Sequence, residues 1–223
     1  MCKKEILRFQ KIDYVIRYPE GFSEDKKYPL VIYVHGAGGR GRDINLIYNH
    51  GFFTDTEPHL TDAVSVAPQC YADSWFNIFE QLHNYVEAMI ALPFVDPDRV
   101  YLMGASMGGY CTWQLAMSRP ELFAAIAPIC GGGMYWNTAR LKSTPVWAFH
   151  GDSDGTVLPE ESRKMVDGVN KNGGCARLTI YESTAHNAWT PTFKDPNVWN
   201  WLLSHRNSYT AQRTEFNDTK TYG

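Results

Sequence analysis

The sequence predicts one α/β domain whose central sheet is mostly parallel and carries helices on both faces. Continuous apolar runs, typical of strands buried on both faces, alternate with segments of helical periodicity along most of the 223 residues. This length suits a single domain with one sizeable core. We therefore expect one domain over residues 1–205, followed by a polar tail over residues 206–223 that lacks a packing pattern.

The expected strands follow from two kinds of apolar pattern. Residues 11–18 alternate apolar and polar side chains, which predicts a half-exposed, antiparallel strand early in the sheet. Residues 29–35 and 63–67 are continuous apolar runs, as central strands of a parallel sheet are. Further strands are expected at residues 99–104, 123–130, 144–150 and 176–182.

Helices are expected between these strands. Within residues 75–92, Leu82, Val86 and Met89 recur at three-to-four spacing, which places them on one core-facing stripe. Pro120 follows a second helical segment and a pair of glycines follows a third, so both segments have stop signals. The other predicted helices cover residues 107–118, 159–172 and 195–205.

Composition and charge exclude several classes of partner. The chain is 44% hydrophobic and 20% charged, as an ordinary globular protein is, and it has no apolar run long enough to cross a membrane. The formal net charge is −3, so no basic field points to nucleic acid or to an anionic membrane. We therefore expect a small molecule as the main partner.

The cysteines indicate neither a metal site nor a disulfide framework. The five of them form no C-x-x-C pair and have no histidine at zinc-finger spacing. Because the N-terminal segment also lacks the apolar stretch of a signal peptide, we expect reduced thiols and a cytoplasmic location. Cys2, directly after Met1, leaves open the alternative of a lipoprotein whose signal peptide has been removed.

The stretch GASMGG, residues 104–109, carries the first chemical signal. It matches G-x-S-x-G and lies between a predicted strand and a predicted helix, which is the context that a nucleophile turn requires. In such a turn the serine backbone is strained, and glycines two residues away on either side prevent collisions. Ser106 is therefore expected above the strand ends, with the N–H of Met107 facing a bound carbonyl oxygen.

A serine hydroxyl becomes nucleophilic when a base takes its proton and an acid orients that base. Two carboxylates, Asp152 and Asp154, follow the predicted strand at residues 144–150. His186 lies in the loop after the next strand, so the order along the chain is serine, acid, base. Since each group follows a different strand, the sheet brings them to one edge.

Four motifs together resemble the α/β-hydrolase superfamily, in particular its carboxylesterases, dienelactone hydrolases and polyhydroxybutyrate depolymerases. They are HGAGG from His35, GASMGG around Ser106, HGDSD from His150 to Asp154, and AHNAW around His186. The resemblance covers roughly residues 12–205. It implies the α/β-hydrolase fold with its mostly parallel sheet, and an active site that needs no cofactor or metal.

The resemblance also assigns individual residues. It implies a catalytic triad of Ser106, Asp154 and His186, because the acid in this group is the last residue of H-G-x-x-D, whereas Asp152 has the alternative reading of a turn-forming side chain. The backbone N–H of Met107 is one expected donor of the oxyanion hole. Ala37 is the second expected donor, with Gly38 as an alternative.

These features predict a serine hydrolase that cleaves carboxylic esters through an acyl-enzyme intermediate. Short-chain or aryl esters are expected, including acetyl or feruloyl groups linked to carbohydrate. A thioesterase or peptidase with the same triad is one alternative. A second is a ligand-binding protein of the same fold without catalysis.

Aromatic residues near strand ends are expected to line the substrate pocket. Trp75 and Trp189 lie in predicted loops on the ligand edge, so we assign them, with Gly38, to substrate binding. Trp113 is expected in the core, on the helix after Ser106. The segment from Gly36 to Gly41 also matches the dinucleotide fingerprint G-x-G-x-x-G, but the long helix and the second-strand acid that this fingerprint needs are missing.

Overall fold

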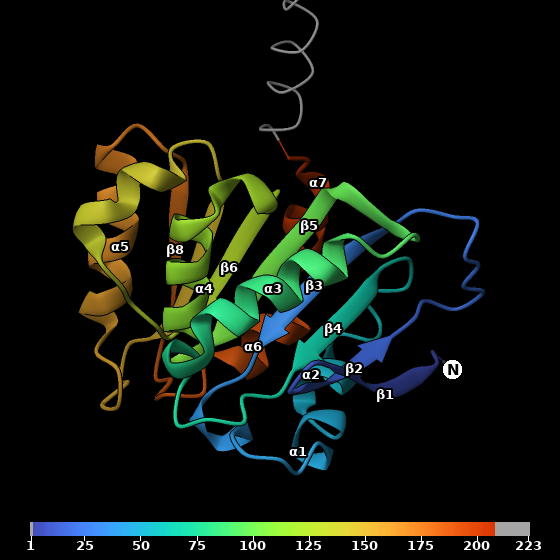
Figure 1. Cartoon of the computed structure of the whole chain (residues 1–223). Coiled ribbons are helices and arrows are strands. Elements are labelled where there is room, and N and C mark those ends of the chain that lie inside the picture. Colours follow the sequence, from blue (N-terminus) through green and yellow to red (C-terminus); the bar gives the residue numbers. More distant parts are fainter. Residues whose placement is uncertain (1, 208–223) are drawn as a thin grey trace, which may run out of the picture.

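The computed structural model describes residues 2–207 and shows one eight-stranded sheet between two layers of helices (Figure 1). The strand order is β1-β2-β4-β3-β5-β6-β7-β8. Strands β3 to β8 are parallel, whereas β1 and β2 are antiparallel to their neighbours. This arrangement confirms the predicted fold class.

The strands of the sheet have the following bounds: β1 (Lys4–Phe9), β2 (Ile12–Arg17), β3 (Tyr28–Val34), β4 (Val64–Pro68), β5 (Val95–Ala105), β6 (Ala125–Ile129), β7 (Val146–Gly151) and β8 (Ala176–Tyr181). The α-helices are α1 (Asn45–Tyr48), α2 (Gly51–Asp55), α3 (Phe79–Ile90), α4 (Met107–Ser118), α5 (Pro159–Lys171), α6 (Trp189–Lys194) and α7 (Pro196–Ser204). Four 3₁₀ segments complete the fold: η1 (Ala37–Gly39), η2 (Trp75–Ile78), η3 (Pro120–Leu122) and η4 (Tyr135–Leu141).

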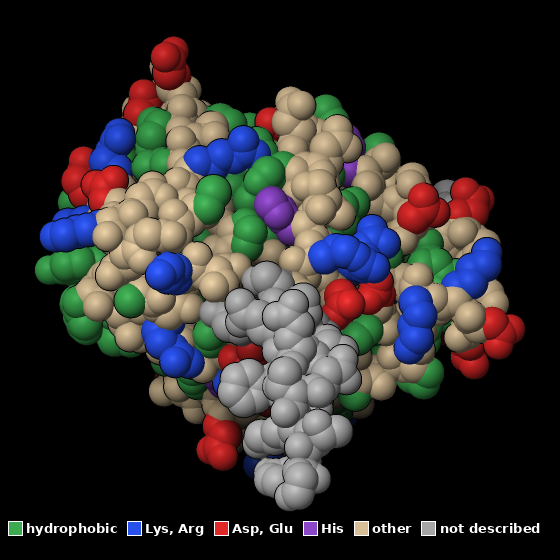
Figure 2. Space-filling view, turned by 90° about the horizontal axis from the view of Figure 1, so that it is seen from above, with side chains coloured by type: hydrophobic (Ala, Val, Ile, Leu, Met, Phe, Trp, Pro, Cys, Tyr) green, Lys and Arg blue, Asp and Glu red, His purple; other side chains and the backbone are tan. Residues whose placement is uncertain are grey.

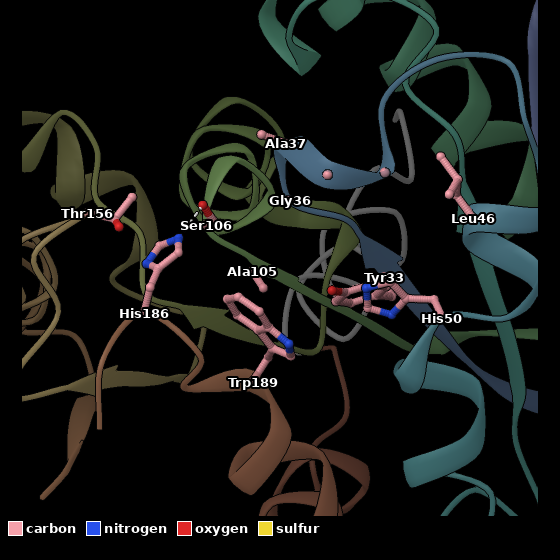
Figure 3. Close-up of a pocket in the computed structure, with 12 residues that line it drawn as sticks. Tyr33, Gly36, Ala37, Leu46, His50, Ala105, Ser106, Thr156, His186 and Trp189 are labelled. Atoms are coloured by element: carbon pink, nitrogen blue, oxygen red, sulfur yellow. Dashed lines mark hydrogen bonds between the residues drawn. The ribbon is translucent and has the colours of Figure 1, made fainter. Parts of the chain in front are cut away.

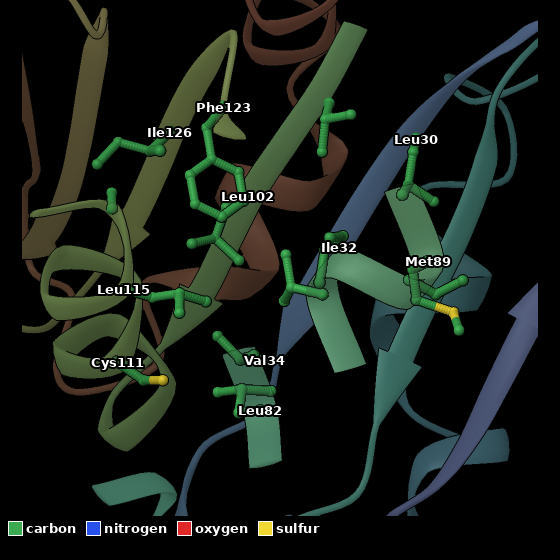
Figure 4. Close-up of a cluster of buried hydrophobic side chains, with 14 of the residues drawn as sticks. Leu30, Ile32, Val34, Leu82, Met89, Leu102, Cys111, Leu115, Phe123 and Ile126 are labelled. Atoms are coloured by element: carbon green, nitrogen blue, oxygen red, sulfur yellow. The ribbon is translucent and has the colours of Figure 1, made fainter. Parts of the chain in front are cut away.

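Each face of the sheet has its own apolar core, because successive side chains of a strand point to opposite faces. On one face, Val34 and Leu102 of the central strands meet Leu82 of α3 and Leu115 of α4, all fully buried (Figure 4). The opposite core contains Tyr33 from the same strand as Val34 and includes residues of α2, α6 and α7. Both faces of the central strands are covered, which explains their continuous apolar runs.

Some elements differ from the sequence predictions. The helix predicted over residues 75–92 is a 3₁₀ turn followed by α3, since Ser74 caps the N–H of Phe76 and starts the turn early. Strand β1 was not expected as a separate element, because three of its six residues are exposed and its apolar residues do not alternate. Helices α1, α2 and α6 have four to six residues, too few for a periodic signal.

Two residues assigned to the predicted tail, 206 and 207, contact the domain. Asn207 is buried, with its backbone N–H donating to the carbonyl of Asp98 (2.8 Å) and its side-chain amide to that of Glu121 (2.7 Å). Arg206 forms an ion pair with Asp96 (3.3 Å). Residues 206 and 207 therefore belong to the domain, and the rest of the predicted tail, residues 208–223, lies outside the described residues.

The surface carries charges of both signs. Figure 2, which views the end of the molecule at the top of Figure 1, shows Lys and Arg side chains interspersed with Asp and Glu. Among residues 2–207, every helix is too short or too polar to cross a lipid bilayer. The carboxyl ends of the parallel strands lie at the opposite end of the molecule, at the bottom of Figure 1.

Candidate active site

Ser106 forms the turn between the end of β5 and the start of α4. Its backbone has φ 57° and ψ −119°, a conformation that residues with a side chain rarely adopt. The turn is held in place because the N–H of Ser106 donates to the carbonyl of Ile129 in β6 (2.9 Å). The strained serine of the nucleophile turn is therefore present, as the motif predicts.

Two glycines give this turn the space that it needs. A Cβ atom on Gly108 would lie 1.9 Å from the carbonyl oxygen of Val34, because the first turn of α4 packs directly on the end of β3. A Cβ atom on Gly104 would lie 2.5 Å from the carbonyl oxygen of Gly108. Real Cβ atoms do not approach other atoms so closely, so no side chain fits at either position.

Ser106, His186 and Asp154 lie within hydrogen-bond distance in series. The hydroxyl of Ser106 is 2.8 Å from Nε2 of His186 (Figure 3). On the other side of the ring, Nδ1 of His186 is 2.7 Å from Oδ2 of Asp154. Because the carboxylate accepts, Nδ1 carries the proton and Nε2 is free to accept from the serine. The structure thus brings together the three residues that the sequence assigns to the triad.

The carboxylate of Asp154 is buried and well supplied with donors. Its Oδ1 accepts from the backbone N–H groups of Thr156 (2.9 Å) and Val157 (3.0 Å). Burial alone would raise the pKa of Asp154, but the hydrogen bonds from His186 and from these two amides lower that pKa below its usual value. Asp154 is therefore held as a carboxylate opposite His186.

Asp152 has a different place. Its side chain is exposed, accepts from the backbone N–H of Thr184 (3.2 Å) and pairs with the hydroxyl of Ser153 (2.7 Å). These contacts join the loop after β7 to the loop after β8. The structure thus gives Asp152 the turn-forming role and places Asp154 next to His186.

The loop after β3 presents a backbone N–H beside Ser106. The carbonyl of Gly36 accepts from Nδ1 of His35 (2.6 Å) and from the N–H of Gly39 (3.1 Å). In a trans peptide the N–H points away from the carbonyl, so the N–H of Ala37 points away from the His35 ring. Among the described residues, neither the Ala37 nor the Met107 amide has an acceptor.

A cavity of about 470 Å³ opens beside Ser106 and His186 (Figure 3). Trp189 forms one wall, with its ring perpendicular to that of His186 at 5.5 Å between centroids. Most of the lining is apolar or backbone, and Thr156 and His50 add polar side chains. The full lining comprises Tyr33, Gly36, Ala37, Gly38, Gly39, Leu46, His50, Ala105, Ser106, Thr156, His186 and Trp189.

The assignment of Trp75 to substrate binding was wrong. Its side chain is fully buried, lies against the ring of His35 at a tilt of 52° and donates from Nε1 to the His35 carbonyl (2.9 Å). Trp75 therefore braces the loop after β3 from within the core. Gly38 and Trp189, the other two residues assigned to substrate binding, do line the cavity. Trp113 lies in the core.

Several residues of the site were not found from the sequence. Tyr33, Leu46 and His50 line the cavity, but Leu46 and His50 come from short helical segments without a motif, and Tyr33 was assigned to a buried strand. From the sequence, His150 was only the first residue of the HGDSD motif. In the structure it lies 3.2 Å from Asp154, a contact that the spacing H-G-x-x-D could have suggested.

A group of potential metal ligands overlaps the triad. The Sγ of Cys130 and the ligand atoms of Asp154 and His186 lie within 4.8 Å of one another. Burial raises the pKa of the Cys130 thiol to about 12, whereas a metal requires the thiolate. Both ring nitrogens of His186 already have hydrogen-bond partners. The three side chains of this group are therefore better suited to the hydrogen bonds between Asp154, His186 and Ser106 than to binding a metal ion.

Comparisons with known proteins agree with the fold. The crystal structure of a thermostable esterase superposes with a TM-score of 0.82 and 31% identity, covering 92% of this chain. The chain belongs to the α/β-hydrolase superfamily. The sequence pattern of the prolyl oligopeptidase family, Peptidase_S9, matches residues 69–136 of this α/β-hydrolase.

Curated relatives of this α/β-hydrolase include esterases and a depolymerase. A probable feruloyl esterase C of Aspergillus terreus is 25% identical over 75% of the chain, and poly(3-hydroxyalkanoate) depolymerase C of Paucimonas lemoignei is 45% identical over 39% of it. The chain spans 64% and 28% of these two relatives and 63% of the thermostable esterase. These comparisons confirm the superfamily that the four motifs predicted.

The close contact between α4 and β3 predicts that Gly108→Ala destabilises the protein. The added Cβ would lie 1.9 Å from the Val34 carbonyl oxygen, so we expect the free energy of unfolding to fall by about 3 kcal/mol in urea titrations. Gly155→Ala is the matched control, since a Cβ there meets nothing within 4 Å. Equal stability of the two variants would contradict the proposed contact.

Proposed function

We propose that the protein is a serine hydrolase that cleaves carboxylic esters through an acyl-enzyme intermediate. The observation that carries this proposal is the series Ser106 Oγ, His186 Nε2 and Asp154 Oδ2, joined at 2.8 and 2.7 Å, at the mouth of a cavity. The relatives named as feruloyl esterases and the superposed thermostable esterase support the reaction class.

The first half of the reaction transfers the acyl group to the protein. The Oγ of Ser106 attacks the ester carbonyl carbon while its proton moves to Nε2 of His186. The carbonyl oxygen becomes an oxyanion, to which the N–H groups of Ala37 and Met107 donate. The tetrahedral intermediate then expels the alcohol, which takes the proton from His186, and leaves Ser106 acylated.

In the second half of the reaction, water removes the acyl group from Ser106. His186 takes a proton from the water that attacks the acyl carbon, and the same two N–H groups stabilise the second oxyanion. The proton on His186 then returns to Ser106 as the acid leaves. Throughout, Asp154 stays ionised and accepts from Nδ1, which fixes the ring and stabilises the transient imidazolium.

The cavity favours a short acyl chain or an aryl group. Its volume is at the small-ligand end of the usual range for binding sites. Tyr33, Leu46 and Trp189 provide apolar walls, and Tyr33 is itself stacked on Phe52 at 4.5 Å. A flat aryl group fits such walls, which is consistent with the feruloyl esterases among the relatives. We propose aryl or short-chain esters, including carbohydrate-linked ones, as substrates.

A peptidase with the same triad is the second candidate. The match to the prolyl oligopeptidase family favours it, as does a probable dipeptidyl-peptidase 5 of Aspergillus terreus that is 27% identical over 66% of this chain. The chain spans 22% of that relative. Release of an aryl amine from amide substrates, measured beside the matched esters, distinguishes the two activities.

Ser106 should react with a fluorophosphonate probe. We expect one covalent adduct, located on Ser106 by mass spectrometry, because His186 accepts the hydroxyl proton as the phosphorus is attacked. Ser106→Ala should lose both the adduct and the hydrolysis of p-nitrophenyl acetate while keeping its circular dichroism spectrum. A folded wild-type protein that takes no label would favour a ligand-binding role.

The two carboxylates after β7 provide a matched pair. Asp154→Asn should lower kcat by about ten-thousand-fold, because the amide no longer holds the tautomer of His186 that accepts from serine. Asp152→Asn should stay within about threefold of wild type, since Asp152 supports only the neighbouring loop. Steady-state kinetics on one aryl ester measure both, and equal losses would contradict the assignment of the acid.

A further inference from the structure

His150 is a fully buried histidine at the end of β7 that the proposed mechanism does not use. Its Nε2 lies 3.2 Å from Oδ2 of Asp154 and 2.9 Å from the carbonyl oxygen of Val157. The same Oδ2 atom is 2.7 Å from Nδ1 of His186. One carboxylate oxygen thus lies between two imidazole rings, one in the core and one at the cavity.

The two oxygens near Nε2 fix the proton on this nitrogen. A carbonyl and a carboxylate oxygen can only accept hydrogen bonds, so Nε2 of His150 must be the donor to both. Asp154 then receives four donors: two backbone amides at Oδ1 and two imidazole N–H groups at Oδ2. This set satisfies the buried carboxylate and restrains its orientation.

The other ring nitrogen reaches a different part of the fold. Nδ1 of His150 is 2.7 Å from the hydroxyl of Ser162 in α5, and that hydroxyl is 2.9 Å from the carbonyl of Gly131. With Nε2 protonated, Nδ1 of neutral His150 can only accept, so the single hydroxyl hydrogen of Ser162 is shared between Nδ1 and the Gly131 carbonyl. A hydrogen-bonded path therefore runs from Asp154 through His150 to α5 and to the loop that follows β6.

We propose that His150 is a positioning residue for the triad, a role that rests on the proposed esterase function. Its Nε2–H fixes the Asp154 carboxylate and offsets part of its negative charge. The contact between Nδ1 and Ser162 fixes the His150 ring against α5. His150 touches neither the serine nor the cavity, and it acts on His186 only through the shared oxygen of Asp154.

The pH dependence of the rate reports this role. Besides the two histidines, two further titratable groups interact with the charge of Asp154. They are the thiol of Cys130, from the loop after β6, and the hydroxyl of Tyr110, from α4. Burial raises the pKa of the Cys130 thiol and of the Tyr110 hydroxyl, so both stay neutral near pH 7. Burial also lowers the pKa of His150, which keeps that ring neutral.

Removal of the Nε2–H group should make His186 easier to protonate. Asp154 would then present its full negative charge to His186, and an unshielded negative charge favours the imidazolium. Since protonated His186 cannot accept from Ser106, the acid limb of the kcat/KM profile should move to higher pH. A residue that only filled space would lower activity or stability without moving this limb.

Two amide substitutions separate the contacts of His150. In His150→Gln the amide nitrogen can occupy the place of Nε2 and keep the donor to Asp154. In His150→Asn the amide oxygen can occupy the place of Nδ1 and accept from the Ser162 hydroxyl, while the contact to Asp154 is lost. Both side chains carry the same amide group, so the two variants differ in which of the two contacts of His150 is kept.

We expect His150→Gln to keep the wild-type acid limb. His150→Asn should lose about tenfold in kcat/KM, the size of one hydrogen bond to a charged group. Its acid limb should move up by about 0.5–1 pH unit. An acid limb that is unchanged in His150→Asn, or that shifts equally in both variants, would overturn the proposal.

A measurement on the wild-type protein keeps the proposal testable if the variants do not fold. Nitrogen NMR of ¹⁵N-histidine-labelled protein should show His150 protonated at Nε2 at neutral pH, and a ring protonated only at Nδ1 would overturn it. If Ser106 takes no fluorophosphonate label, the proposed function fails separately, while the tautomer of His150 is still measured.

Discussion

The site depends on the close packing of the first turn of α4 against the end of β3. Gly108 lies almost in contact with the carbonyl of Val34, and this approach forces the chain to reverse within a single residue after β5. Ser106 therefore takes a positive φ, and its hydroxyl reaches His186. The same packing leaves the N–H of Met107 free at the start of the helix. One steric constraint thus supplies both the exposed nucleophile and an anion-binding donor.

Burial and hydrogen bonding then set the charges around this turn. A buried carboxylate is stable only when donors surround it, and Asp154 has donors from its own loop and from two histidines. On the other side, His35 holds the Gly36 carbonyl inward and so turns the next N–H outward. Both sets of donors belong to the protein itself, so the site is organised before a substrate binds.

The motifs predicted the fold class, the superfamily and the three residues that meet at the cavity. This was possible because each motif combines a strand end with a chemically distinctive side chain. The direction in which a side chain points depends on tertiary contacts, which a short motif does not contain. Trp75 was predicted in a loop on the ligand edge, yet it begins η2, and its buried indole donates to the carbonyl of His35. His150 likewise depends on tertiary contacts, since its partner Ser162 comes from a different element.

The most direct test of the account is a crystal structure of the protein with a phosphonate covalently bound to Ser106. The account predicts a phosphoryl oxygen within hydrogen-bond distance of the N–H groups of both Ala37 and Met107, with the remaining substituent in the cavity beside Trp189. It also predicts that the serine keeps its positive φ. An adduct whose phosphoryl oxygen points away from both amides would contradict the claim that this turn builds an oxyanion site.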